Sequence, residues 1–319
     1  MKSIIRIAGS VLFTILGASA GLAQQHRTFV SGAGSDTNPC SFALPCRSFG
    51  KAISVTDTGG EVAALDGAQY DPFAITKSIS IETSAGASVT VPSGGDGITI
   101  SAPSGSNVAL RGLTIHAEGG GRYGIHSNSG SNVTLHIENC VVAGFSGAPG
   151  AGVEFDGTGQ LLVKETIARG NYYGISVNPS GGFSLVYLDG VSLDGNFLGL
   201  ILGGLSGVTV GAIRGSSAIS SGNYGIEVYG SSSSSAYLDI ESCVIANNAY
   251  GLLAEGTQAG MSLSNSLISH NASMGWNQVS GGFIDSRGNN SVVGNGPSSP
   301  ATLKIPPLLR TPQAPPFQQ

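Results

Sequence analysis

Charged residues are scarce in this 319-residue sequence. They make up 10% of the chain, 14 Lys and Arg against 19 Asp and Glu, and the net charge of −5 includes no basic run or stripe. Nucleic acids and anionic membranes are bound through clustered Lys and Arg. The sequence therefore argues against both partners. It also lacks the long apolar runs of 3.6-residue period that helical repeats require.

Histidine and cysteine are few as well. No two of the five His have the spacing of a zinc site, so we expect no metal and no cofactor. Cys40 and Cys46 enclose a five-residue loop that a disulfide can close, which is typical of exported proteins. Cys140 and Cys243 hold the same position in two repeats several turns apart. We predict that they are buried, unpaired thiols.

Glycine, in contrast, is abundant. The chain has 50 Gly and 40% apolar residues, a composition typical of many short strands joined by tight turns. An aromatic, apolar or small residue, then Gly, then an aliphatic residue or Trp recurs about every 25 residues. The glycines of this motif are Gly124, Gly152, Gly174, Gly199, Gly225, Gly251 and Gly275, with Gly97 as an earlier instance.

Each period contains about three short strands. Runs such as Val133–Ile137 alternate apolar and polar residues, a second apolar pair follows, and then Asn stands beside a small or polar residue. Asn and Gly tolerate the left-handed backbone angles of a sharp corner. Pairs at these corners are Gly170-Asn171, Gly195-Asn196, Gly222-Asn223, Asn247-Asn248 and His270-Asn271. A unit of this size buries its apolar face only by stacking on its neighbours, so we predict a parallel β-helix. A propeller, with blades of about 40 residues, does not fit this period.

The beginning of the repeat region resembles a known family. The segment 27–36, Pro45 to Phe49 and Ala52-Ile53, continued by 60–70 and 75–81, resembles the entry motif of pectate-lyase-like, right-handed parallel β-helix proteins. The resemblance covers residues 27 to about 295. It implies an all-β, single-domain solenoid with a short capping helix, expected at Arg47 to Val55.

The two ends of the chain differ in composition from the repeats. Lys2 and Arg6 followed by the apolar stretch 7–16 predict a signal peptide cleaved after Ala23, with Ala20 as the competing site. A membrane anchor is the alternative, but the apolar stretch is short for a span. Half of all prolines follow Gly296, where the stack should end. The predicted parts are a signal peptide (1–23), an N-terminal cap segment (24–60), a parallel β-helix (61–296) and a Pro-rich tail (297–319), with a secreted or periplasmic location.

Motifs for catalysis are missing. Polygalacturonase-like members of the fold use Asn-Thr-Asp, Asp-Asp, Gly-His-Gly and Arg-Ile-Lys, and none of these occurs here. Pectate-lyase-like members need clustered acids for calcium and a basic residue that removes the proton. The dispersed acids of this chain do not provide that group.

The strongest candidate for a site is a polar strip on three successive turns. Alternation after the Gly corner points Ile125, Val153 and Ile175 inward, and the polar residues beside them outward. Stacked turns would align these side chains, and tyrosines just before the strands would offer faces for sugar rings. Outward strand positions are usually only solvated, and that reading is the alternative. The candidate ligand-binding residues are His126, Asn128, Glu154, Asp156, Ser176, Asn178, Tyr123 and Tyr173.

A row of charges alternates in sign along the repeats. We align Glu138, Lys164, Asp189, Arg214 and Glu241 at one outward position, with single-residue gaps near Lys164 and Arg214. Opposite charges across a ladder stabilise its register, so we interpret the row as register control.

Two functions remain. The first is an exported, non-enzymatic β-helix that binds a surface polysaccharide or serves as an envelope scaffold. The second is a polysaccharide lyase or glycoside hydrolase with an unfamiliar site around His126, Glu154 and Asp156. The near-constant repeat length leaves little chain for cleft walls, which favours the first.

Overall fold

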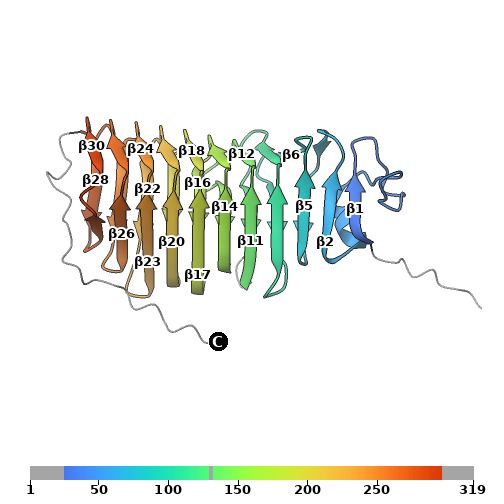
Figure 1. Cartoon of the computed structure of the whole chain (residues 1–319), viewed down its shortest axis with the longest axis horizontal. Helices are drawn as coiled ribbons and strands as arrows, with labels where there is room; N and C mark the ends of the chain where they lie inside the picture. Colours follow the sequence, from blue (N-terminus) through green and yellow to red (C-terminus); the bar gives the residue numbers. More distant parts are fainter. Residues whose placement is uncertain (1–24, 129–131, 297–319) are drawn as a thin grey trace, which may run out of the picture.

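The computed structural model describes residues 25–128 and 132–296. The predicted signal peptide (1–23) and Pro-rich tail (297–319) lie outside these residues. The chain winds into a right-handed parallel β-solenoid with three sheets along its length (Figure 1). All strand pairs are parallel, and each strand pairs with its equivalents one turn before and one turn after. The predicted fold class, an all-β single domain with one short helix, is confirmed.

The three sheets alternate along the chain in the order A, B, C. Sheet A contains β1 (Gln25–Val30), β2 (Thr56–Ala64), β5 (Ile79–Thr83), β8 (Asn107–Arg111), β11 (Asn132–Glu138), β14 (Thr158–Lys164), β17 (Ser180–Asp189), β20 (Ser206–Arg214), β23 (Ser234–Glu241), β26 (Ala259–Ser264) and β29 (Phe283–Ser286). Sheet B contains β3 (Gln69–Tyr70), β6 (Ser88–Val91), β9 (Thr114–Ala117), β12 (Val141–Ala143), β15 (Ile167–Arg169), β18 (Ser192–Asp194), β21 (Ser217–Ile219), β24 (Val244–Ala246), β27 (Leu267–Ser269) and β30 (Ser291–Val293). Sheet C contains β4 (Phe73–Ile75), β7 (Asp96–Ile100), β10 (Tyr123–Ser127), β13 (Ala151–Phe155), β16 (Tyr173–Val177), β19 (Leu198–Leu202), β22 (Tyr224–Tyr229), β25 (Tyr250–Glu255) and β28 (Met274–Val279).

The core is a continuous column of aliphatic residues inside the solenoid. Ile125, Val153 and Ile175 stack in register on sheet C and are fully buried, as the alternation predicts. Leu135 and Leu161 do the same on sheet A. Because each turn buries its apolar face only against its neighbours, the fold depends on this exact stacking of equivalent residues.

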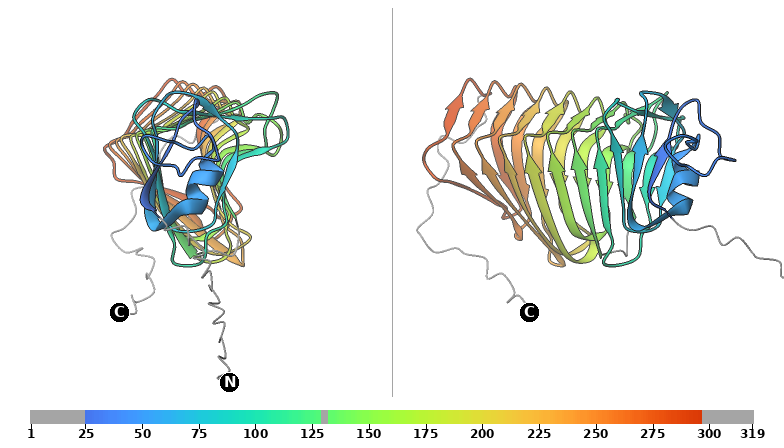
Figure 2. Two further views of the ribbon diagram at one scale, coloured as in Figure 1. Left: turned by 90° about the vertical axis from the view of Figure 1, so that its right-hand side faces the viewer. Right: turned by 45° about the vertical axis from the view of Figure 1, so that its right-hand side comes forward.

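The N-terminal end of the column is covered. Helix α1 (Phe49–Val55) lies across it and buries Phe49, Ala52 and Ile53 (Figure 2). Ser48 caps the helix through its hydroxyl, which accepts from the Lys51 N–H at 3.2 Å. This helix lies within the predicted stretch. Within the described residues, no helix is long and apolar enough to cross a bilayer.

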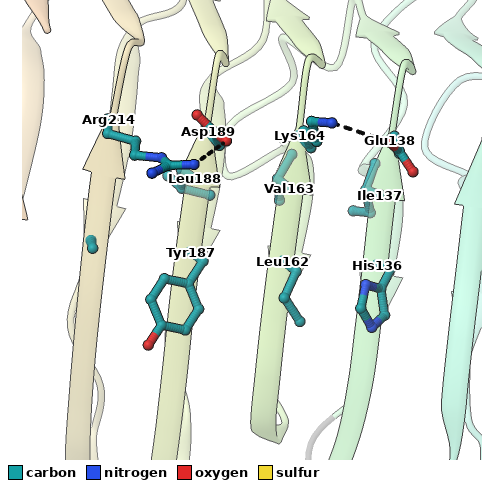
Figure 3. A pocket seen from close by; sticks show the side chains of 11 residues that line it. His136, Ile137, Glu138, Leu162, Val163, Lys164, Tyr187, Leu188, Asp189 and Arg214 are labelled. Carbon is teal, nitrogen blue, oxygen red and sulfur yellow. Dashed lines mark hydrogen bonds and ion pairs between the residues drawn. The ribbon is translucent and has the colours of Figure 1, made fainter. Parts of the chain in front are cut away.

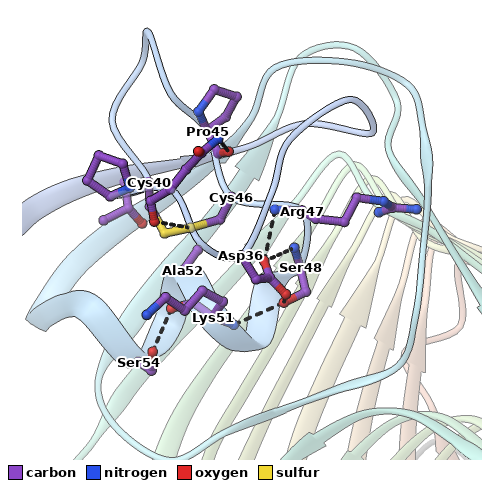
Figure 4. The surroundings of a disulfide bond; sticks show 12 residues. Asp36, Cys40, Pro45, Cys46, Arg47, Ser48, Lys51, Ala52 and Ser54 are labelled. Atoms are coloured by element: carbon purple, nitrogen blue, oxygen red, sulfur yellow. Dashed lines mark hydrogen bonds between the residues drawn. A yellow bond between two sulfur atoms is a disulfide. The ribbon is translucent and has the colours of Figure 1, made fainter.

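A disulfide loop completes this cap. Cys40 and Cys46 are bonded, with their Cα atoms 4.6 Å apart (Figure 4). The loop lies along the free edge of β1, since the Phe29 N–H donates to the Cys40 carbonyl and the Cys46 N–H to that of Phe29. Asp36 holds the loop to the helix start by accepting from the Arg47 and Ser48 N–H groups, both at 2.9 Å. The edge of the first strand is therefore covered.

The corner between sheets B and C contains a ladder of buried amides. At a typical corner a residue with a positive φ angle is followed by an Asn, which donates hydrogen bonds to the Asn one turn later. For example, the Asn171 backbone N–H and side-chain NH₂ both donate to the Asn196 Oδ1. The ladder explains the recurring glycines, because a Cβ on Gly152 would lie 2.8 Å from the Asn171 amide nitrogen. The residues at this position are Asn171, Asn196, Ser221, Asn248, Asn271 and Asn295.

One predicted corner pair was assigned to the wrong position. Gly222-Asn223 is not the corner of its turn; the left-handed residue is Ser220, and Ser221 occupies the ladder position. Serine is too short to reach the previous Asn, and the Ser221 hydroxyl is buried without a hydrogen-bond partner. Periodicity placed the corner two residues late because Asn223 is the only Asn in that stretch.

The corner between sheets A and B explains the two remaining cysteines. Cys140 and Cys243 are buried and unpaired. Thr166 and Ser266 follow them at the same position one turn later, and their hydroxyls accept from the Cys140 and Cys243 N–H groups. This corner position is thus occupied by a small side chain that carries a thiol or a hydroxyl group. The two thiols therefore serve as buried packing groups.

Candidate functional site on the outer face of sheet C

The predicted polar strip exists as a row on the outer face of sheet C. His126, Glu154 and Ser176 pair in register on β10, β13 and β16. Their exposure differs from the expectation of a solvated strip: His126 is 9% exposed, Glu154 5% and Ser176 4%. Strand alternation sets only the direction of a side chain. Packing of neighbouring side chains over the row decides its burial.

These residues form one hydrogen-bonded network with Asp156, which follows the end of β13. The Ser176 hydroxyl donates to the Glu154 Oε1 at 3.0 Å, Glu154 and Asp156 share a hydrogen bond, and the Asp156 Oδ2 lies 3.0 Å from the His126 Nε2. We call His126, Glu154, Asp156 and Ser176 the acid network. Asp156 thus reaches back to the histidine of the preceding turn, a contact that strand register alone does not predict.

The two carboxyl groups of the network differ in protonation. Burial raises the pKa of Glu154 to about 9, and its hydrogen bond to Asp156 and the Asp156 charge act in the same direction. Burial alone would raise the pKa of Asp156 too, but hydrogen bonds with His126 and Glu154 hold it below its ordinary value. Near neutral pH, Glu154 therefore keeps its proton and donates it to the Asp156 carboxylate. An ionised carboxylate only accepts, so the His126 Nε2 carries a hydrogen.

The other nitrogen of His126 faces a second acid. The Nδ1 is buried without a hydrogen bond and lies 3.9 Å from the Asp96 Oδ2. Asp96 in turn binds the Arg122 guanidinium through two bonds of 2.8 and 3.0 Å. Asp96 and Arg122 were not among the predicted site residues. Asp96 could have been found from the repeat, because Asp96-Gly97-Ile98 is equivalent to Tyr123-Gly124-Ile125 one turn later.

The tyrosines of the candidate set line one side of the network. The Tyr123 ring packs 4.5 Å from the His126 ring, beneath the Arg122 guanidinium at 4.7 Å. Tyr173 meets Tyr172 edge to face at 4.8 Å. Tyr224 and Tyr250 continue the same position on β22 and β25, with ring centroids 4.8 Å apart. All four rings of this tyrosine row, Tyr123, Tyr173, Tyr224 and Tyr250, are half-buried.

The two candidate asparagines lie apart from the network. The Asn128 side chain is half-buried and donates to the Ser101 hydroxyl at 2.6 Å. Asn178 is exposed, and its backbone N–H donates to the Phe155 carbonyl. Both stand at the far ends of their strands and are open to a ligand only at the rim of this face.

A further acid on the same face was missed. Glu227 on β22 continues the row of His126, Glu154 and Ser176, and burial and the Glu255 charge raise its pKa to about 7. It is half-buried and lies on the same strand as Tyr224. The sheet C face thus combines half-exposed aromatic rings with acids that are neutral or partly neutral near pH 7.

The geometry of the acid network limits its chemistry. Glycoside hydrolysis needs two carboxyl groups separated by about 5–9.5 Å, with room for the sugar or a water between them. Glu154 and Asp156 are hydrogen-bonded to each other. Among the described residues, no group of three or more His, Cys, Asp or Glu is arranged to hold a metal ion.

The outer face of sheet A has a groove of about 490 Å³ (Figure 3). Leu162, Tyr187 and Ala212 line its middle, and Glu138, Lys164, Asp189 and Arg214 line one side. Arg214 binds Asp189 at 2.9 Å and Lys164 lies 3.7 Å from Glu138. The predicted alignment of the charges is confirmed by the strand register, and it extends to two earlier residues. The full charge row is Glu82, Arg111, Glu138, Lys164, Asp189, Arg214 and Glu241.

Comparison with known proteins supports the fold. A family model described as right handed beta helix region matches residues 123–295, more than half of the chain. Among solved structures, the pectate lyase Pel9A aligns with a TM-score of 0.58 at 15% identity, over 88% of this chain and 80% of that one. A rhamnogalacturonan lyase aligns with a TM-score of 0.46 at 13% identity, over 84% of this chain and 87% of that one. No curated protein matches the sequence. At these identities the likeness to solved structures concerns the fold alone.

Proposed function

The chain belongs to the family of right-handed β-helix proteins, and on that premise we propose that it is an exported, non-enzymatic protein that binds a polysaccharide along the outer face of sheet C. The fold by itself does not decide this, since one fold carries many functions. The pectate lyase with the same fold supports a polysaccharide as the class of ligand.

The tyrosine row is the observation that carries the proposal. Strands in a sheet lie about 4.8 Å apart, so Tyr123, Tyr173 and Tyr224, two turns apart from each other, present a ring about every 10 Å along the solenoid. Each ring is half-buried, so part of it is exposed to solvent, and exposed aromatic rings can pack against sugar rings. Asn128 and Asn178 at the rim and Arg122 above Tyr123 offer hydrogen bonds to hydroxyl groups.

Export is part of the same proposal. The Cys40–Cys46 disulfide persists in an oxidising compartment, and the basic and apolar pattern of residues 1–23 is that of a signal peptide. An extracellular or periplasmic location would place the chain where polysaccharides are found.

The test is a binding screen of the mature chain against neutral and acidic polysaccharides. We expect Tyr173→Ala and Tyr224→Ala each to weaken binding roughly five- to tenfold, since one aromatic contact is worth about 1–1.5 kcal/mol. Tyr237→Ala is the matched control, because Tyr237 is a half-buried tyrosine on the outer face of sheet A. Loss of binding in the control, or none in the two sheet C variants, would contradict the proposal.

Catalysis by the acid network is the second candidate function. The neutral Glu154 is the observation in its favour, because a buried acid with a raised pKa is suited to donate a proton. The same screen measures reducing ends and the absorbance of unsaturated products. Cleavage that disappears in Glu154→Gln and His126→Ala would establish a lyase or hydrolase in place of a binding protein.

A further inference from the structure

The middle of sheet A exposes apolar side chains where a solvated face would carry polar ones. Outward positions on β5 and β11 hold Ser80, Thr134 and His136, and β26 holds Ser262. Between them, β14, β17 and β20 present an apolar patch, and Phe183 and Tyr187 are 45% and 46% exposed. The patch comprises Leu162, Phe183, Leu185, Tyr187, Val208, Val210 and Ala212. A contiguous exposed patch of this kind marks an interaction surface.

The charge row borders this patch and has a special symmetry. Its seven residues alternate strictly in sign, one per turn. If a second copy is turned about a two-fold axis that runs parallel to the strands and midway between two adjacent strands, row residues at equal distances on either side of the axis face each other, and each such pair is of opposite sign. A pattern with this property is complementary to itself, as a two-fold interface requires.

We propose that this face of sheet A pairs with the same face of a second copy of the chain. The axis lies midway between β17 and β20, at the centre of the apolar patch. There, Asp189 faces Arg214 of the second copy and Lys164 faces its Glu241, and each contact occurs twice. The Asp189–Arg214 pairs of the two copies, 2.9 Å within one chain, form a square of four alternating charges.

The apolar side chains also match in size under this axis. Tyr187 and Ala212 are register partners on β17 and β20, so the axis places each Tyr187 ring against Ala212 of the other copy. Ala212 lines the groove beside Tyr187, and the ring from the second copy would fill it. In the same way Phe183 faces Val208 and Leu185 faces Val210. Large side chains meet small ones, which allows close packing at the centre of an interface.

The first experiment is sedimentation of the mature chain over a concentration series. We expect a dimer that Ala212→Lys weakens roughly tenfold or more, because the lysine would stand where the Tyr187 ring packs. Ser80→Lys is the control, in the same outward row but five strands away, and should remain dimeric. Both substitutions are on an outward face, and an unchanged far-ultraviolet circular dichroism spectrum would show that the fold is intact.

Charge reversal gives the second test. Arg214→Glu alone would set Asp189 against a glutamate of the other copy, and Asp189→Arg alone would set two arginines together, so both variants should be monomeric. Mixed together, each variant offers the charge that the other needs, and a heterodimer should form. A monomeric or larger wild-type species, a dimer unaffected by Ala212→Lys, or a mixture that stays monomeric would overturn the proposal.

Discussion

The outer faces of sheets A and C use the same strand positions in opposite ways. On sheet A the outward apolar residues are exposed and the charges are paired at the surface; Arg111 bridges Glu82 at 3.0 Å and Glu138 at 3.2 Å with its side chain 40% exposed. On sheet C the outward polar residues of the acid network are buried and are hydrogen-bonded to one another. The difference shows that facing outward and being solvated are separate properties. A polar group covered by its neighbours must find partners within the protein.

A first prediction compares the stability that side chains on the two faces contribute. His126→Ala removes the donor to the Asp156 carboxylate in a buried network and should lower the free energy of unfolding by about 1–3 kcal/mol. Arg111→Ala removes two ion pairs from the exposed charge row and should cost less than about 1 kcal/mol. Urea unfolding of both variants measures the contrast. Equal losses of unfolding free energy would mean that the acid network contributes no more to stability than the exposed charge row.

The pH dependence of stability should reside on sheet C. The pKa of Glu154 is about 9 in the folded chain and 4.5 in its ordinary state. Below pH 4.5 both states hold the proton, and above it the unfolded chain releases a proton that the folded chain keeps. The free energy of unfolding should therefore fall as the pH rises from about 5 to 8, by up to about 1.4 kcal/mol per pH unit.

Glu154→Gln is the variant that tests this slope. The amide can still donate to Asp156 and accept from Ser176, so the variant should keep the network and lose most of the pH dependence. Glu227, with a pKa of about 7, contributes a slope that persists in the variant up to that pH. Wild-type and variant melting curves with parallel pH profiles would show that Glu154 is ionised in the folded chain.

The smallest expected effect concerns the buried corner that leads into sheet C. Ser221→Asn would give the ladder its missing amide, with an oxygen for the Asn196 N–H and a donor for the sheet B carbonyl below. The gain should be about 0.5–1.5 kcal/mol in thermal or urea unfolding. Asn248→Ser, which creates the same defect one turn later, should lose a comparable amount. A destabilised Ser221→Asn would indicate that the corner has no room for the longer side chain.

The repeat made most of the fold predictable. Gly motifs about every 25 residues located the turns of the solenoid, and alternation placed Ile125, Val153 and Ile175 inside with His126, Glu154 and Ser176 in one outward row. These features depend on local backbone geometry and on pairing of identical units, and both are visible in a linear pattern. The charge row was aligned for the same reason, apart from Glu82 and Arg111.

The repeat in the sequence was thus enough to predict the solenoid and the inward or outward direction of the strand residues in its regular turns, because these follow from a period and from strand alternation. The return of Asp156 to His126, the burial and protonation of Glu154 and the break in the amide ladder at Ser221 became visible only in the folded chain. Burial, pKa and hydrogen-bond partners depend on side chains from neighbouring turns, about 25 residues away in the chain. Contacts between turns bring these groups within a few ångströms, and a linear pattern contains no such distances.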